Sequence, residues 1–167
     1  KVEDNPDVSF IPFSREEMVI TVSTEHPFVR KKAVTFAELA QEPFIMKENG
    51  SGTRKLVEGL FARDNCVPNV LMETSNTEFI KQSVMRGEGV SFLVREAVEA
   101  EIKEGKLTIV DVIGSKVYLD VSIAYLKDQV LSPSAQAFVD TLGSLKPEDM
   151  HPMGIGALMA KMLAQRK

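Results

Sequence analysis

The sequence has little of what catalysis and metal binding require: one cysteine, two histidines and no tryptophan in 167 residues. Cys66 cannot form a disulfide within the chain, which is compatible with a reducing cytoplasm. His26 and His151 each precede a proline, a loop context that supports no Ser-His or Cys-His pair with Ser51 or Cys66. No spacing of Cys, His and acidic residues indicates a zinc or calcium site. We therefore expect no catalytic residue, no metal and no cofactor, and we interpret the protein as a non-enzyme.

The sequence also lacks a long apolar run and a cluster of basic residues. No stretch approaches the roughly 20 apolar residues of a membrane-spanning helix, so we expect no membrane partner. The net charge is -4, whereas nucleic-acid binding requires a basic face. The start shows neither a signal peptide nor an initiator methionine, so we interpret Lys1 as a cut or the start of a fragment. With 44% hydrophobic residues, the chain can form one domain or two small lobes.

Among the features that the sequence does contain, the most informative is a glycine-rich turn at Glu48–Arg54. It lies between the apolar run Pro43–Met46 and a segment with helical spacing, which predicts a strand, a tight turn and a helix. Hydroxyl groups and free backbone N–H groups at a helix start form an anion site. Capping needs only a hydroxyl, so Ser51 or Thr53 acting as a simple cap is the alternative. Arg54 could pair with an anionic ligand or with a nearby acid.

The rest of the chain repeats this strand-to-helix pattern. Residues 70–72 predict a strand, and Ser75 or Asn76 is expected to cap the helix that follows, so two polar helix starts could face one cleft. Alternation of short strands and helices argues for parallel βαβ units. The further expected strands are 8–13, 18–23 (buried on both faces), 90–94, 107–112 and 117–125. The further expected helices begin at Thr35 with a capping box, at Arg95, at Pro133 and in the amphipathic tail after Pro147.

The order of these features resembles the effector-binding domain of LysR-type transcriptional regulators. The resemblance covers roughly residues 10–138 and is carried by five runs in sequence. They are Phe13–Pro27, Phe36–Ile45, Gly50–Arg54 and Ser75–Lys81 followed by Val84–Leu93. Each run is short, and the specificity lies in their order and spacing.

The resemblance implies an α/β fold of the type II periplasmic-binding-protein kind, with two βαβ lobes joined by two crossover segments. The incomplete first lobe is expected to comprise residues 1–23 and 94–146, the second lobe residues 24–93, and the C-terminal tail residues 147–167. The crossovers imply a hinge at Thr21, Val22, Ser23, Phe92, Leu93 and Val94. In the family the cleft binds a small effector, which here implies ligand-binding residues Ser51, Gly52, Thr53, Ser75 and Asn76. These coincide with the two helix starts.

The resemblance implies a bacterial, cytoplasmic regulator that binds a small effector, and the hydroxyl-bearing helix starts favour an anion as that effector. The family's DNA-binding domain and the first strands of the first lobe are expected to lie outside this chain, so DNA would be bound only through that other domain. We expect the incomplete lobe to be covered by a partner copy, a companion fragment or the tail, with a homodimer or homotetramer as the main expectation. The alternatives are a stand-alone solute-binding protein of the same fold or, less favoured, an enzyme on this fold.

Overall fold

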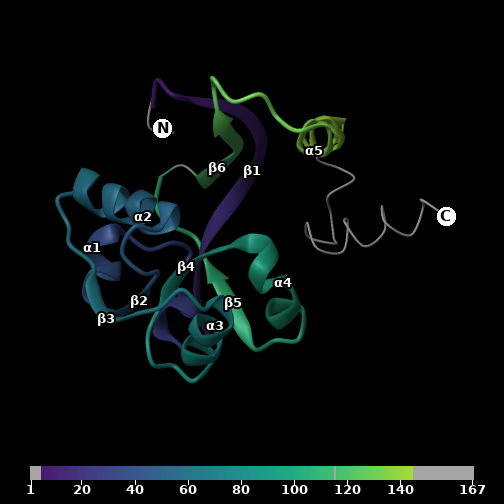
Figure 1. Cartoon of the computed structure of the whole chain (residues 1–167). Coiled ribbons are helices and arrows are strands. Elements are labelled where there is room, and N and C mark those ends of the chain that lie inside the picture. The colour runs from purple at the N-terminus through teal and green to yellow at the C-terminus, as the bar shows by residue number, and fades with distance from the viewer. Residues whose placement is uncertain (1–4, 115, 145–167) are drawn as a thin grey trace. The chain divides into compact units, whose positions relative to one another are not determined.

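The computed structural model describes residues 5–114 and 116–144 (Figure 1). The described residues form two compact units, one within residues 16–119 and one that combines residues 5–15 with residues 120–144. Among the described residues, no helix is long and apolar enough to cross a membrane. The larger unit contains both predicted helix starts.

The larger unit is organised around strand β1 (Val8–Ser23), which pairs antiparallel with β4 (Ser91–Val94) and with β5 (Leu107–Val110). Ile20 lies opposite Phe92 on one side and Val110 on the other. Residues 18–23 are all buried, which confirms the predicted central strand covered on both faces. The prediction of two separate strands at 8–13 and 18–23 was wrong, because the polar residues between them continue the same extended strand.

The glycine-rich turn lies within a parallel βαβ unit. Strands β2 (Pro43–Met46) and β3 (Asn69–Glu73) pair in parallel, and helix α2 (Gly52–Arg63) connects them. A parallel bridge between Phe44 and Val90 joins β2 to the residue before β4. The parallel arrangement predicted from sequence is therefore confirmed for β2 and β3. β4 and β5 each pair antiparallel with β1, which lies between them, so these two strands run in the same direction as each other.

Two apolar cores cover the two faces of the strands of the larger unit. This follows from the alternation of side chains along a strand. Met18, Ile20 and Val22 pack in one cluster with Phe36 and Phe61, which lie on α1 and α2. The second cluster contains Val19 of β1, Ile45 of β2 and buried residues of α3 and α4, including Ile80 and Val98. The strands of this unit are thus enclosed between two helical layers (Figure 1).

The remaining elements of the larger unit are short helices. They are η1 (Pro27–Arg30), α1 (Phe36–Leu39), α3 (Thr77–Met85) and α4 (Arg95–Lys103). The predicted capping box of α1 is present, with Thr35 and Glu38 bonding each other's backbone N–H groups. Buried Lys81 joins α3 to α4, because its Nζ lies 2.7 Å from a carboxylate oxygen of Glu101.

The smaller unit contains the start of β1, most of β6 (Val117–Leu126) and α5 (Pro133–Ser144). β6 pairs with β1, and the Lys127 N–H donates to the Asp7 carbonyl at 2.9 Å. The helix expected in the tail after Pro147 lies outside the described residues. The two-lobe division at residues 23 and 94 stays a prediction.

Candidate functional site

Helices α2 and α3 begin beside each other because of the parallel pairing of β2 and β3. The register places Met46 opposite Glu73, so both strands end at the same edge of the sheet. The chain then turns into α2 at Gly52 and into α3 at Thr77. The Thr74 N–H donates to the Met46 carbonyl at 3.1 Å, which ties the two turns together. We call residues 51–53 and 75–76 the paired helix starts.

The start of α2 is not capped by a side chain. Ser51 occupies the N-cap position with extended backbone, but no side chain there makes a capping hydrogen bond. Gly50 before it has φ of +89°, a left-handed conformation that favours glycine. A capping hydrogen bond from the Ser51 hydroxyl, the alternative left open by the sequence, is therefore not observed, and this hydroxyl is partly exposed.

The start of α3 is capped, and the cap is Asn76 rather than Ser75. The Asn76 side-chain oxygen accepts a hydrogen bond from the Phe79 N–H at 3.1 Å. Ser75 and Asn76 are both exposed. The structure thus brings all five predicted ligand-binding residues to one edge, with the Asn76 side-chain oxygen already engaged by the helix.

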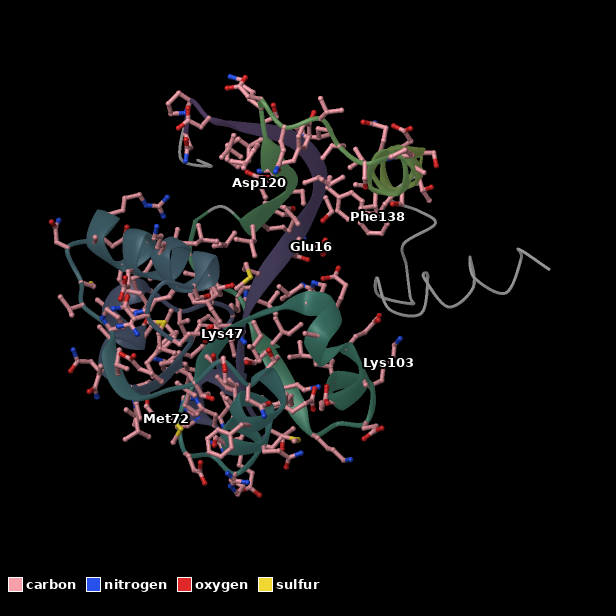
Figure 2. The ribbon with its side chains drawn as sticks, viewed as in Figure 1. Glu16, Lys47, Met72, Lys103, Asp120 and Phe138 are labelled. Carbon is pink, nitrogen blue, oxygen red and sulfur yellow. The ribbon has the colours of Figure 1, made fainter. Side chains whose placement is uncertain are left out.

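Lys47, which is labelled in Figure 2, contacts the start of α3, and sequence reasoning did not single it out. It follows β2 directly, and its Nζ donates to the Ser75 carbonyl at 2.6 Å and to the Thr77 hydroxyl at 2.8 Å. Both acceptors are neutral oxygens, so these contacts leave the charge of the ammonium group in place. Its position immediately after the strand was the only signal that could have indicated it.

Arg54 pairs with acids of its own unit. Its side chain contacts Glu73 at 2.6 Å and Glu58 at 2.7 Å, and it also donates to the Lys47 carbonyl at 3.3 Å. Hydrogen bonds to Glu73 and Glu58 raise the pKa of Arg54. Of the two roles left open by the sequence, pairing with a nearby acid is the one observed. Arg54 thereby connects the first turn of α2 to the ends of β2 and β3.

The predicted hinge residues lie in the buried ladders of the larger unit. Residues 18–21 pair with residues 94–91, whereas Val22 and Ser23 lie opposite Thr108 and Leu107. The Thr21 hydroxyl donates to the Ser91 carbonyl at 3.1 Å. These contacts describe one conformation, so the hinge stays a prediction.

Nothing in residues 5–114 and 116–144 groups three or more Cys, His, Asp or Glu side chains at a distance that would hold a metal ion. His26 caps η1, accepting the Phe28 N–H on Nδ1 at 3.2 Å, while Cys66 donates its thiol hydrogen to the Asp64 carbonyl at 3.3 Å. Each therefore has a local structural role.

Comparison with known families agrees with this arrangement of elements. The model of the LysR substrate binding domain matches residues 1–146. The chain belongs to the LysR substrate-binding domain family. Membership accounts for the order of runs along the sequence and for the α/β fold of the periplasmic-binding type.

Curated relatives of this LysR-family domain are transcription regulators. The transcriptional activator CmpR of Synechocystis is 38% identical over 142 residues, which cover 85% of this chain and 47% of that protein. The regulator CbbR of Rhodospirillum rubrum is 39% identical over 122 residues, which cover 73% of this chain and 40% of that protein. The chain thus spans less than half the length of these relatives.

Solved structures show the same fold. The regulatory domain of Synechocystis CcmR, solved in complex with 2-PG, has a TM-score of 0.75 and 32% identity and covers 85% of this chain and 68% of that one. The effector-binding domain of QuiR with shikimate also has a TM-score of 0.75, at 24% identity, with the same 85% of this chain and 66% of that one covered.

Proposed function

We propose that this chain is the effector-sensing part of a bacterial LysR-type transcription regulator, and that it binds a small anion at the paired helix starts. The observation that carries the site is a start of α2 without a side-chain cap at the same sheet edge as the start of α3, which the ammonium group of Lys47 contacts. The CcmR regulatory domain supports the function, because a related domain of this fold holds a small molecule, 2-PG.

The charge of the ligand is argued from the chemistry of this edge. A helix N-terminus presents backbone N–H groups and a partial positive charge, which favour an anion. Lys47 adds a full positive charge at the start of α3, while the acids that pair with Arg54 keep that guanidinium engaged. Carboxylate, sulfate and phosphate groups fit this combination of hydroxyl, amide and ammonium donors.

A ligand at this edge would act by preferring one arrangement of the regulator over another, and it can shift the equilibrium only by that preference. In this proposal the regulator works in the cytoplasm as a homo-oligomer and contacts DNA through a domain outside this chain. Closure around the hinge at residues 21–23 and 92–94 would connect the effector to the arrangement of subunits.

The site is tested by isothermal titration of the chain with sulfate, phosphate and 2-PG. The double variant Ser51→Ala with Thr53→Ala should weaken binding of whichever anion binds by at least about tenfold, because it removes two hydroxyl donors to a charged group. Thr24→Ala is the matched control: Thr24 is exposed and follows β1, which runs antiparallel to β4 and ends at the opposite edge of the sheet. Equal affinity in the double variant and the control would remove the paired helix starts as the site.

A further inference from the structure

A cavity of about 300 Å³ opens within the larger unit, away from the residues of the paired helix starts. It lies where β1 enters the sheet and where β4 and β5 end. Its apolar wall includes Met18, Ile20, Phe92, Val110 and Val117. The volume is at the lower end of small-molecule sites, so it suits a compact ligand with an apolar body.

Three charged side chains form a cluster in the lining of this cavity. The Glu17 carboxylate is held from both sides: one oxygen bonds Arg95 Nε, and the other lies 2.9 Å from Lys116 Nζ. Hydrogen bonds from Arg95 and Lys116 lower the pKa of Glu17, and the bond to Glu17 raises the pKa of Lys116. The cluster is therefore a carboxylate held between two cations beside an apolar wall.

The charges of the lining balance. Asp111 is the remaining charged residue of the cavity wall, so two acids face two cations. An anionic ligand would meet no excess of positive charge in this cavity. It could bind the two cations only by displacing a protein carboxylate that is already bound to them. Glu17 is that acid, because it is the one bonded to both Arg95 and Lys116.

We propose that this cavity is a second ligand site, and that it takes a small organic carboxylate whose apolar body contacts the wall while its carboxylate exchanges with that of Glu17. Glu17 thus holds the place of the ligand's acid group when the site is empty and competes with the ligand for Arg95 and Lys116. The site is independent of the paired helix starts, since no residue of 47–54 or 74–77 lines the cavity.

If a ligand exchanges with Glu17, replacing Glu17 by a neutral residue should increase the affinity of the chain for a carboxylate ligand. In a titration of the chain followed by NMR, cyclohexanecarboxylate serves as the probe and cyclohexylmethanol as its uncharged match. Glu17→Gln should bind the acid about fivefold more tightly than the unaltered chain, because the competing carboxylate is gone and both cations are released. Glu16→Gln is the matched control, since it changes the net charge equally and Glu16 is not among the residues that line the cavity.

A second variant and a second readout complete the test. Arg95→Gln should weaken binding of the acid severalfold, and Ser51→Ala with Thr53→Ala should leave it unchanged, which separates this site from the paired helix starts. Equal affinities in Glu17→Gln and Glu16→Gln, or binding of the alcohol as tight as that of the acid, would overturn the exchange. If the NMR spectrum shows that Glu17→Gln is folded but the acid does not bind to it, the cavity is not a ligand site.

Discussion

Gly89 lies where two backbone segments approach too closely for a side chain. A Cβ atom at this position would lie 2.5 Å from the Pro43 carbonyl oxygen, a backbone atom that cannot rotate away. The same carbonyl accepts the Val90 N–H at 2.8 Å, so the contact joins the start of β2 to the start of β4. Absence of a side chain at residue 89 thus lets β2 lie against the segment that leads into β4.

Gly89→Ala should therefore lower the free energy of unfolding by about 2 kcal/mol, the cost of overpacking a close contact. Gly59→Ala is the control: it replaces a glycine inside α2 where a Cβ meets no atom within 4 Å. That control should raise the free energy of unfolding by about 0.5–1 kcal/mol, because alanine has the better helix propensity. Urea denaturation of both variants measures the difference, and equal stabilities would contradict the steric explanation.

At the scale of elements, the short helix α1 depends on its N-terminal cap. One Glu38 carboxylate oxygen accepts bonds from the backbone and hydroxyl of Thr35 at 2.7 and 2.8 Å, and Lys31 bonds the other at 2.7 Å. The bond from Lys31 and those from Thr35 lower the pKa of Glu38 from 4.5 to about 2. A four-residue helix has few hydrogen bonds of its own, so the cap decides where it begins.

The lowered pKa predicts a pH dependence with a definite sign. The folded chain keeps Glu38 ionised more strongly than the unfolded chain, so its contribution to stability is complete above pH 4.5 and declines as the pH falls towards about 2. Glu38→Gln should be less stable than the unaltered chain at pH 7, and the difference should narrow across this window. Urea denaturation from pH 7 to 2 measures it, with Glu25→Gln in the exposed loop after β1 as control. A difference independent of pH would contradict the capping role of the carboxylate.

At the scale of the whole molecule, the smaller unit exposes large apolar side chains. Leu126 is 52% exposed, Val130 96% and Phe138 43%. Phe138 is labelled in Figure 2. In the described part of this unit, two strand segments and one helix provide little apolar surface to cover them. This favours the homo-oligomer expected from the sequence, in which a second copy covers these residues.

Sedimentation velocity over a concentration series should therefore show the chain associating, with the average mass rising as concentration increases. Phe138→Asp should shift the distribution towards the monomer, because it places a charge in the apolar surface. Ser134→Asp adds the same charge at an exposed position of α5 and should leave the distribution unchanged. A monomer at every concentration would contradict the association.

Local features of the sequence were sufficient to predict most elements and the chemistry of their boundaries. The apolar run at residues 18–23 indicated the buried central strand, and the spacing of Thr35 and Glu38 indicated the capping box. The glycine-rich turn and the polar residues before α3 indicated two helix starts. These signals are readable because they depend on residues a few positions apart, where periodicity and hydrogen-bond reach determine the conformation.

Contacts between distant residues were decided only by the tertiary structure. The parallel register of β2 and β3 brings the paired helix starts to one edge, and Lys47 bonds a turn 28 positions along the chain. Glu17 meets Arg95 across 78 positions because β1 runs antiparallel to β4. The local sequence pattern predicts neither the direction nor the register of strand pairing, because both depend on which apolar faces the folded chain can bury together.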